Sequence, residues 1–483
     1  MENQLLNEEE TLTYMNPSEI KEYDVYPYQD ERKTALKKVR DRIKSLGLWD
    51  QSQILGRRYS IGCVALEITQ RCNLDCTLCY LSEMSEAVKD VPIKEVFRRI
   101  EKIYELYGDN TDVQVTGGDP TLRRKDELLA IIKKIKSTGM RPTLMTNGIK
   151  ATRQLLTEMR QAGLEDVAFH VDLTQERKGY DTEASLNEIR LNYIERAKGL
   201  GLSVLFNTTV CAENFYEIPE IANFFVKHAD VVNFFSFQLQ AETGRGVLRE
   251  RDFIITQDTV TAQVERGIGI KPNFDVIVSG HKKCNRYSSL FVVNGNCYDT
   301  FFDVDFAQKM MNETSDIISV RGDQSSMAMK LVKRILSKPK NWIPSLNYMA
   351  RLLWMIKWDL IKAKGKVRKL SFFSHNFMDA CQLEKDRIDA CSFTVATSEG
   401  CISMCLHNAK RDEYILQPVK IDSSENGDTI WNPLIGETNT QEKPTEVEIR
   451  KGQLKGRLKV DRTIQTPVTV TVKGENLNNE KAV

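Results

Sequence analysis

The stretch Cys72-Asn73-Leu74-Asp75-Cys76-Thr77-Leu78-Cys79-Tyr80 directly follows the strand-like run Val64–Thr69. One tight loop therefore presents three thiolates to one point. A tetrahedral zinc site requires a fourth protein ligand nearby. A [4Fe–4S] cube held by three thiolates instead leaves one iron open for a substrate or a cofactor. The alternatives are a structural zinc knuckle and scattered core cysteines.

The composition indicates a cytoplasmic, globular protein of two or three domains. The chain has 483 residues, with 68 Lys and Arg against 67 Asp and Glu, so no global field favours nucleic acid. Residues 1–10 are acidic and lack an apolar core, so no secretory signal is expected. No apolar run approaches the roughly 20 residues that span a bilayer. Eleven cysteines in such a chain indicate metal ligands or buried thiols rather than a disulfide framework.

From about residue 58 to residue 245, short strand-like runs alternate with amphipathic helical stretches. The predicted strands are Val64–Thr69, Asp112–Thr116, Thr143–Thr146, Val167–Asp172, Ser203–Val210 and Val231–Gln240. The predicted helices span about Ile93–Tyr107, Lys125–Ser137, Ala151–Gln161, Ala184–Lys198 and Glu217–His228. Six strand–helix units imply a parallel sheet with right-handed crossovers. A full barrel has eight.

Alternation within these strands places polar side chains on the inner face. His170 and Asp172 share one face of the fourth strand, and Asn207 and Thr209 share one face of the fifth. A purely structural barrel would fill its interior with branched apolar residues instead. Because parallel α/β folds place their sites at strand C-termini, we expect a cavity there.

Two turns follow predicted strands. Thr116-Gly117-Gly118-Asp119-Pro120 ends the second strand, and Thr146-Asn147-Gly148 ends the third. The paired glycines remove side chains, so that backbone carbonyls can approach a ligand, and the proline sets the turn. Alone, such a turn is ordinary, but its position about forty residues after the cysteine loop makes it informative.

The pattern Cys-x3-Cys-x2-Cys-aromatic, followed by Gly-Gly-Asp-Pro, resembles the radical S-adenosylmethionine (radical SAM) superfamily. The resemblance implies an open, partial (β/α)6 barrel. It implies that Cys72, Cys76 and Cys79 bind a [4Fe–4S] cluster whose open iron chelates the methionine part of SAM. Reductive cleavage of SAM would then yield a 5′-deoxyadenosyl radical that abstracts hydrogen from a substrate. An electron donor such as ferredoxin or flavodoxin is implied as a partner.

The same resemblance assigns the SAM contacts. The carbonyls of Gly117 and Gly118, with the acid of Asp119, would hold the SAM ammonium group, although the superfamily usually has glutamate at position 119. Thr146 and Asn147 would line the SAM pocket. The predicted contacts to ribose or substrate are His170, Asp172, Asn207 and Thr209. No catalytic residue of the chain itself can be named.

A second group of cysteines lies in the C-terminal half. It resembles the cysteine hairpin of auxiliary-cluster domains, and four thiolates close an iron–sulfur cube completely. The preferred ligand set is Cys284, Cys297, Cys391 and Cys405, with Cys381 and Cys401 as rivals. Unligated thiols and zinc are the alternatives.

The stretch His375-Asn376-Phe377-Met378-Asp379, with Cys405-Leu406-His407-Asn408, resembles the branch that contains the archaeal tetraether lipid synthase. This resemblance implies functionalisation of unactivated carbons in lipid or isoprenoid chains. A maturase of a ribosomally synthesised peptide is the alternative enzyme. A non-catalytic iron–sulfur carrier or regulator is the alternative from another class.

The segment 327–370 is basic and rich in tryptophan. It contains one acid, Asp359, among Trp342, Trp354, Trp358 and many lysines and arginines. Such an amphipathic segment is typical of helices that lie on an anionic bilayer, here the inner face of the membrane. A helical insert packed on the barrel fits the pattern equally well, and nucleic acid is a weaker third interpretation.

The expected domain order follows from these segments. Residues 1–57 form an N-terminal extension with a helix at Glu31–Leu46, and 58–275 form the barrel. Residues 276–425 form an auxiliary-cluster region that includes the insert 327–370. Residues 426–483 are expected to be a polar, flexible tail, in which Val468–Val472 forms a strand beside Leu458–Val460.

Overall fold

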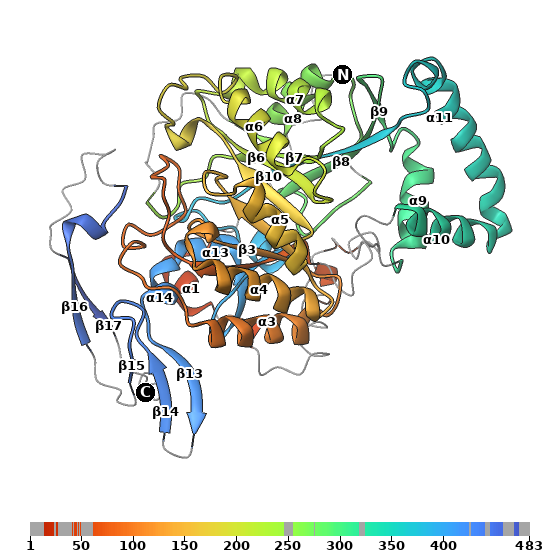
Figure 1. The fold of residues 1–483 in the computed structure, drawn as a ribbon. Coiled ribbons are helices and arrows are strands. Elements are labelled where there is room, and N and C mark those ends of the chain that lie inside the picture. Colours follow the sequence, from red (N-terminus) through yellow and green to blue (C-terminus); the bar gives the residue numbers. More distant parts are fainter. Residues whose placement is uncertain are drawn as a thin grey trace, which may run out of the picture.

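The main sheet contains six parallel strands in sequence order (Figure 1). They are β2 (Cys63–Thr69), β3 (Asp112–Gly117), β4 (Arg141–Thr146), β5 (Asp166–His170), β6 (Ser203–Val210) and β7 (Val232–Leu239). The helices between them are α3 (Ile93–Tyr107), α4 (Lys125–Ser137), α5 (Arg153–Ala162), α6 (Asn187–Ala197) and α7 (Ile218–Lys227). The predicted partial (β/α)6 barrel is confirmed.

The structure is a computed structural model. The described residues are 14–23, 26–27, 41, 43–45, 47, 49, 61–245, 255–274, 276–317, 324–424, 427–439, 445–456 and 468–472.

The apolar periodicity explains why the helices cover the outside of the sheet. Leu66 and Ile68 of β2 point outward and are fully buried. On α3, Val96, Ile100 and Ile103 recur at helical spacing and are buried in the same core. The inner strand face, which carries the polar residues, is left to line a cavity.

Two parallel strands from the C-terminal half extend this sheet at its two edges. The strand β11 (Phe393–Ala396) pairs with β2, and β10 (Arg368–Asn376) pairs with β7. Eight consecutive strands are therefore parallel, in the order β11-β2-β3-β4-β5-β6-β7-β10. The predicted boundary at residue 275 thus does not separate the barrel from the C-terminal region.

The two edge strands approach each other through aromatic side chains. The ring of Phe393 at the start of β11 lies 5.9 Å from that of Phe373 and 4.6 Å from that of His375, both on β10. Among the described strands, no backbone ladder joins β10 to β11. Side-chain packing therefore fills the last gap in the curled sheet.

Shorter elements surround this sheet. Antiparallel strands continue both edges: β8 (Asn285–Val293) and β9 (Asn296–Asp299) beyond β10, and β12 (Gly400–Ser403) and β1 (Tyr26–Pro27) beyond β11. The remaining helices of this part are α1 (Pro17–Glu22), α8 (Gln257–Ile268), α12 (Lys385–Asp389), α13 (Met404–Ala409) and α14 (Arg411–Ile415). Short 3₁₀ turns are η2 (Pro120–Leu122), η3 (Leu173–Gln175), η4 (Phe215–Glu217), η5 (Pro339–Asn341) and η6 (Lys451–Gln453).

The N-terminal segment packs against the C-terminal half. Met15 is buried in a cluster with Leu383, Ile402 and Leu406. Its backbone N–H donates to the carbonyl of Leu383 at 2.7 Å. The helix predicted at Glu31–Leu46 lies largely outside the described residues.

Three helices project from one side of the barrel, and we call them the helical arm (Figure 1). They are α9 (Val304–Thr314), α10 (Gln324–Leu336) and α11 (Trp342–Lys362). The carboxylate of Asp359 on α11 accepts hydrogen bonds from Asn294, Asn296 and Tyr298 of the β8–β9 hairpin. The ring of Tyr348 stacks on Phe302 at 4.7 Å. These contacts fix α11 to the barrel.

The expectation of a flexible tail after residue 426 is wrong for the described residues. The strands β13 (Val419–Ser424), β14 (Gly427–Trp431) and β15 (Thr438–Asn439) form one sheet, and β16 (Thr445–Ile449) pairs with β17 (Val468–Val472). Leu434, Ile449 and Leu454 are buried in a cluster with Ile415 of helix α14 and residues 87–88, and Trp431 is buried as well. The strand Val468–Val472 exists, but its partner is β16, and residues 458–460 lie outside the described chain.

Among the described residues, no helix combines the length and the apolar character that crossing a bilayer requires.

We expect Phe372→Ala to destabilise the protein by about 3–5 kcal/mol, because Phe372 is fully buried on β10 and packs on Phe235 and Phe237. Denaturant unfolding checks this, with Trp354→Ala as the control. Trp354 is 72% exposed on the arm, so its truncation should change the free energy of unfolding by no more than about 0.5 kcal/mol. Equal effects of the two variants would mean that β10 is not an integral barrel strand.

Candidate active site

The three predicted cluster cysteines follow the C-terminal end of β2 and line one cavity. Backbone contacts hold their loop in place. The N–H of Cys72 donates to Glu86 at 3.0 Å, and the N–H of Thr77 donates to the carbonyl of Thr174 at 2.7 Å. The hydroxyl of Tyr80, the aromatic residue that ends the motif, donates to the carbonyl of Gly117 at 2.5 Å. The loop is thus tied to the ends of β3 and β5.

The thiols of this loop are buried and influence one another. Burial, together with neighbouring Cys79 and Asp119, raises the pKa of Cys72 to about 11. Burial and the two other cysteines also raise the pKa of Cys76. Three thiolates are therefore unstable side by side unless a cationic centre lies among them, which is what iron supplies.

The donor set fits an iron–sulfur cube better than a single zinc ion. Among the described residues, no three His, Cys, Asp or Glu side chains come close enough to hold one metal ion. Arg245 is fully buried beside the loop, and its guanidinium Nη1 has no hydrogen-bond partner among the described residues. A cluster carrying three thiolates would compensate this buried positive charge.

The paired glycines are required by chain packing. A Cβ at Gly117 would lie 2.0 Å from the carbonyl oxygen of Thr69, and a Cβ at Gly118 would lie 1.9 Å from that of Arg71. The N–H of Gly118 donates to Thr69 at 2.8 Å. Both glycines also line the cavity. The turn after β3 thus presses directly on the segment that leads into the cysteine loop.

Asp119 holds this turn in place through four hydrogen bonds to its carboxylate. One carboxylate oxygen accepts from the N–H and hydroxyl of Thr121, and the other accepts from the hydroxyl of Thr146 and the N–H of Asn147. Both oxygens are therefore engaged within the protein. Contact between this carboxylate and the SAM ammonium group would have to replace one of these bonds.

Asn147 connects the end of β4 to the cysteine loop. Its side-chain amide donates to Asn73 at 2.7 Å and lies 3.9 Å from the sulfur of Cys72. Thr146 and Asn147 both line the cavity, as predicted for a SAM pocket.

The predicted polar residues of β5 and β6 meet around one ion pair. The imidazole Nε2 of His170 lies 2.6 Å from the carboxylate of Asp172 and 3.2 Å from the hydroxyl of Thr209. Burial opposes charge on both partners, but their mutual attraction prevails: it raises the pKa of His170 and holds the pKa of Asp172 near 2. His170 and Thr209 line the cavity, whereas Asp172 lies behind them.

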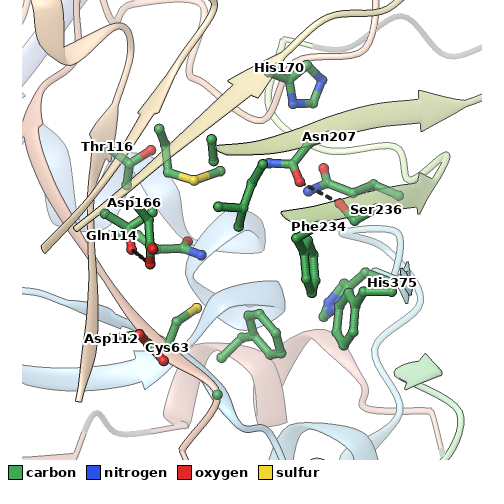
Figure 2. Close-up of a pocket in the computed structure, with 18 of the residues that line it drawn as sticks. Cys63, Asp112, Gln114, Thr116, Asp166, His170, Asn207, Phe234, Ser236 and His375 are labelled. Carbon is green, nitrogen blue, oxygen red and sulfur yellow. Dashed lines mark hydrogen bonds between the residues drawn. The ribbon is translucent and has the colours of Figure 1, made fainter. Parts of the chain in front are cut away.

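The cavity runs along the whole barrel interior and has a volume of about 1430 Å³. Figure 2 shows side chains of several strands converging on it, including Asp112 and Thr116 from the two ends of β3. The hydrogen bond from Ser236 to Asn207 crosses from β7 to β6 in the same wall (Figure 2). At about 3.3 Å per residue, the length of β3 alone gives the cavity a depth of roughly 16 Å.

The end of the cavity away from the cysteines lies under the helical arm. Met311 of α9, Leu331 of α10 and Arg368 at the start of β10 line it there. Val367 beside them is 40% exposed, so this end opens to solvent.

A C-terminal segment covers the cysteine loop, which the sequence did not predict. The ammonium group of Lys455 donates to the carbonyl of Cys72 and lies 2.9 Å from Glu86, which itself accepts the Cys72 N–H. The N–H of Gly456 donates to Asp75 at 3.1 Å. Lys455 binds the carbonyl of Cys72 and Glu86 binds its N–H, so this pair, which we call the clamp, holds both backbone polar groups of Cys72. No motif marks this pair, because its members are far apart in sequence and individually ordinary.

Three of the four predicted auxiliary ligands, Cys284, Cys391 and Cys405, lie near enough to influence one another's charge, and we call them the second thiol group. Burial raises the pKa of Cys405, and Cys391 and Cys284 raise it further. Burial also raises the pKa of Cys284 to about 11, although the Arg387 guanidinium donates to its sulfur at 3.4 Å.

The assignment of Cys297 to this group is corrected by the structure. Cys297 lies on β9 opposite Val292, inside the main hydrophobic core, and burial alone raises its pKa to about 12. Of the rivals, Cys401 lies on β12 in the same core, and Cys381 is exposed. Spacing placed Cys297 correctly beside a strand but could not show which way its side chain points.

Comparison with known proteins agrees with the cysteine loop and the barrel. The sequence profile of the Radical SAM superfamily matches residues 66–225. These residues contain the three cysteines, the glycine turn and the elements from the second half of β2 to most of α7. Residues 66–225 are therefore a radical SAM domain, and enzymes of that superfamily use a [4Fe–4S] cluster with SAM.

Individual relatives are distant. A 7,8-dihydro-6-hydroxymethylpterin dimethyltransferase from Methanocaldococcus jannaschii is 24% identical over 404 residues, covering 74% of this chain and 79% of the relative. The PqqA peptide cyclase of Bradyrhizobium diazoefficiens is 28% identical over 33% of this chain and 41% of its own length. The crystal structure of Streptococcus suis SuiB bound to S-adenosylmethionine is 15% identical, over 47% of this chain and 50% of that chain, with a TM-score of 0.30. The chain thus spans half or less of these last two proteins.

The His170–Asp172 pair predicts a pH-dependent stability. The raised pKa of His170 contributes stability that is complete below its ordinary value of 6.5 and is lost as the pH rises through the folded-state value. The lowered pKa of Asp172 contributes stability above 3.8 that is lost as the pH falls towards 2. His170→Gln should therefore lower the melting temperature more at pH 5.5 than at pH 9. A difference that does not change with pH would contradict the ion pair.

The clamp on Cys72 predicts that Lys455→Gln weakens iron retention. Because partners of ligand residues commonly change metal affinity by 10-fold or more, we expect chelators to remove iron roughly 10-fold faster from this variant after anaerobic reconstitution. Lys150→Gln, at an exposed position after β4, is the matched control and should retain iron as the unaltered protein does. Equal rates for both variants would show that the clamp does not support the loop.

Proposed function

We propose that this protein is a radical SAM enzyme that abstracts hydrogen from an unactivated carbon of a membrane lipid or isoprenoid chain. Cys72, Cys76 and Cys79 are the proposed cluster ligands. The observation that carries the substrate class is the cavity, which extends from these cysteines through the barrel to the helical arm. Bound together, the cluster and SAM supply a 5′-deoxyadenosyl radical.

The size and lining of the cavity support a long substrate. Ligand pockets usually enclose about 300–1,000 Å³, and this cavity, at about 1430 Å³, exceeds that range. Apolar side chains alternate with polar ones along its middle: Ala65, Met145, Ala168, Leu205, Phe234 and Phe373. Arg368 and Lys369 lie at the outer end, where they can pair with an anionic headgroup while the chain extends inward.

The residues at the inner end suit the binding of SAM and the exclusion of water. Asn147, Thr209 and His170 offer hydrogen bonds to ribose and carboxylate groups. Lys455 and the segment around it cover the outer side of the cysteine loop. Exclusion of water there protects a reactive carbon radical from side reactions.

We assign the second thiol group to an auxiliary iron–sulfur cluster. Cys405 is buried, and Cys284 and Cys391 are partly buried. The Cys391 thiol donates to the carbonyl of Phe393, a residue of the cavity wall, at 3.0 Å, and the N–H of Met378 lies 3.5 Å from the sulfur of Cys405. The guanidinium of Arg387 supplies a positive charge next to Cys284, which favours a thiolate-bound, negatively charged centre. Iron counting on Cys405→Ala and Cys297→Ala distinguishes the two cysteines, since only Cys405 belongs to the proposed site.

Methyl transfer to a pterin is the second candidate function. It is favoured by the similarity to the pterin dimethyltransferase, which extends over 74% of this chain. A pterin is a compact, planar molecule and would fill only part of the cavity. The two candidates therefore differ in the molecule that reacts, which is a lipid chain in the first and a pterin in the second.

The decisive experiment follows deuterium. Reconstituted protein is supplied with SAM, a low-potential reductant and lipids with perdeuterated chains, and 5′-deoxyadenosine is analysed by mass spectrometry. Deuterium from the chain should appear in 5′-deoxyadenosine. Cys76→Ala should lose both iron at the loop and 5′-deoxyadenosine formation, whereas Cys211→Ala, a buried cysteine away from the cavity, should retain both.

Two results would contradict the proposal. Retained 5′-deoxyadenosine formation in Cys76→Ala would reject the cluster assignment. Absence of deuterium transfer from lipid, together with methylation of a pterin or a mass shift in a peptide, would reject the lipid chain as substrate.

A further inference from the structure

The outer face of α11 is strongly apolar although it faces solvent. Exposed large residues recur at spacings of three, four and eight along the helix: Ile343 80%, Leu346 70%, Trp354 72%, Trp358 67% and Ile361 68%. At 100° per residue, these positions share one side of the helix. Leu352 and Ile356 on the opposite side are buried against the protein. A contiguous apolar stripe of this kind marks an interaction site.

The neighbouring helix α10 and Trp342 at the start of α11 add to this surface. Met329, Val332 and Leu336 of α10 are also exposed, between about half and three-fifths of their surface. Trp342 lies between the two groups, and its indole N–H donates to the carbonyl of Leu336. The two helices thus present apolar side chains from the same arm.

The part of the arm from α10 to the start of β10 is as basic as it is apolar. Between residues 324 and 369 the sequence has twelve lysines and arginines and one acid, Asp359. The carboxylate of Asp359 is held by the β8–β9 hairpin, away from the apolar stripe. Exposed lysines follow directly after α11 at positions 364, 366 and 369. The ammonium group of Lys357 lies 3.0 Å from the centre of the Trp354 ring, within the stripe itself.

These features favour an interface with a surface that is both apolar and anionic. Helices that lie at a bilayer surface combine Trp and aliphatic residues on one face with flanking lysines and arginines. Anionic headgroups supply the complementary charge, and each basic residue near such a surface contributes to binding. None of the described helices crosses a bilayer, so the contact is peripheral.

We infer that the helical arm is the docking surface for an anionic lipid bilayer, with α10 and α11 lying in the headgroup layer. This inference rests on the proposed function, in which a lipid is the substrate. Docking in this way places the end of the cavity lined by Met311, Leu331 and Arg368 next to the bilayer. The arm then delivers a lipid chain to the strand N-termini, opposite the cysteine loop.

Vesicle co-sedimentation with the full-length protein tests the inference without SAM or reductant. Vesicles of phosphatidylcholine with 30% phosphatidylglycerol are compared with phosphatidylcholine alone, at low and high salt. We expect binding to the anionic vesicles that weakens with salt, and little binding to the neutral ones. Quenching of tryptophan fluorescence by brominated lipid chains should accompany binding and weaken in Trp354→Ser/Trp358→Ser, which leaves Trp342 as the tryptophan of the arm.

Two pairs of variants separate charge from folding. Lys364→Glu/Lys366→Glu should lower the partition coefficient by roughly 25-fold or more, since each basic residue contributes about 5-fold. Lys133→Glu/Lys150→Glu makes the same charge change at exposed positions near α4 and α5 and should bind as the unaltered protein does. Equal melting temperatures show that all variants are folded.

Several outcomes overturn the inference. These are equal binding to neutral vesicles at all salt concentrations, equal loss in both charge pairs, and tighter binding to duplex DNA than to vesicles. A dimer in solution that dissociates in Trp354→Ser/Trp358→Ser would show that a second copy of the chain covers the stripe.

The result is distinguishable from the fate of the proposed function. If arm variants lose vesicle binding but still transfer deuterium from detergent-dispersed lipid, docking and lipid chemistry both stand. If vesicle binding requires the arm but no lipid deuterium is transferred, docking stands and the substrate proposal fails.

Discussion

The close contact between two backbone segments sets the geometry of the whole site. The turn at Gly117 and Gly118 presses on the carbonyls of Thr69 and Arg71, leaving no space for any side chain. Asp119 then fastens this turn to the end of β4 through Thr146 and Asn147. Because the cysteine loop begins immediately after Arg71, this contact fixes where the loop starts. The three thiols are thus positioned by the ends of β2, β3 and β4 together, and a shift in any one strand would displace them.

The features that were predictable from sequence are those with local periodicity or fixed spacing. Strand and helix alternation predicted β2 to β7, because each unit carries its own apolar pattern. The cysteine loop and the glycine turn were predictable because their residues are neighbours in the chain. The clustering of His170 with Thr209 followed from the registry of adjacent parallel strands. In each case a short stretch contains nearly all the information needed.

Other features depend on contacts between distant segments, which spacing does not encode. The strands β10 and β11 carry ordinary strand patterns, and nothing local reveals that they flank β7 and β2. Cys297 and Cys405 look alike in sequence, but one faces the main core and the other faces Cys391 and Cys284. The tail after residue 426 was expected to be flexible because it is polar. A few buried residues such as Leu434 and Leu454 nevertheless pack it on the body of the protein.

The clamp formed by Lys455 has a consequence for the order in which this protein is made. Cys72 emerges from the ribosome long before Lys455, and until then its carbonyl and Glu86 lack their shared cation. The barrel itself acquires β10 and β11 only after residue 396 has been synthesised. The loop is therefore most open while the chain is nascent and becomes covered late. Iron–sulfur delivery during translation would meet a loop that the Lys455 clamp does not yet hold, whereas delivery afterwards would meet the clamped loop.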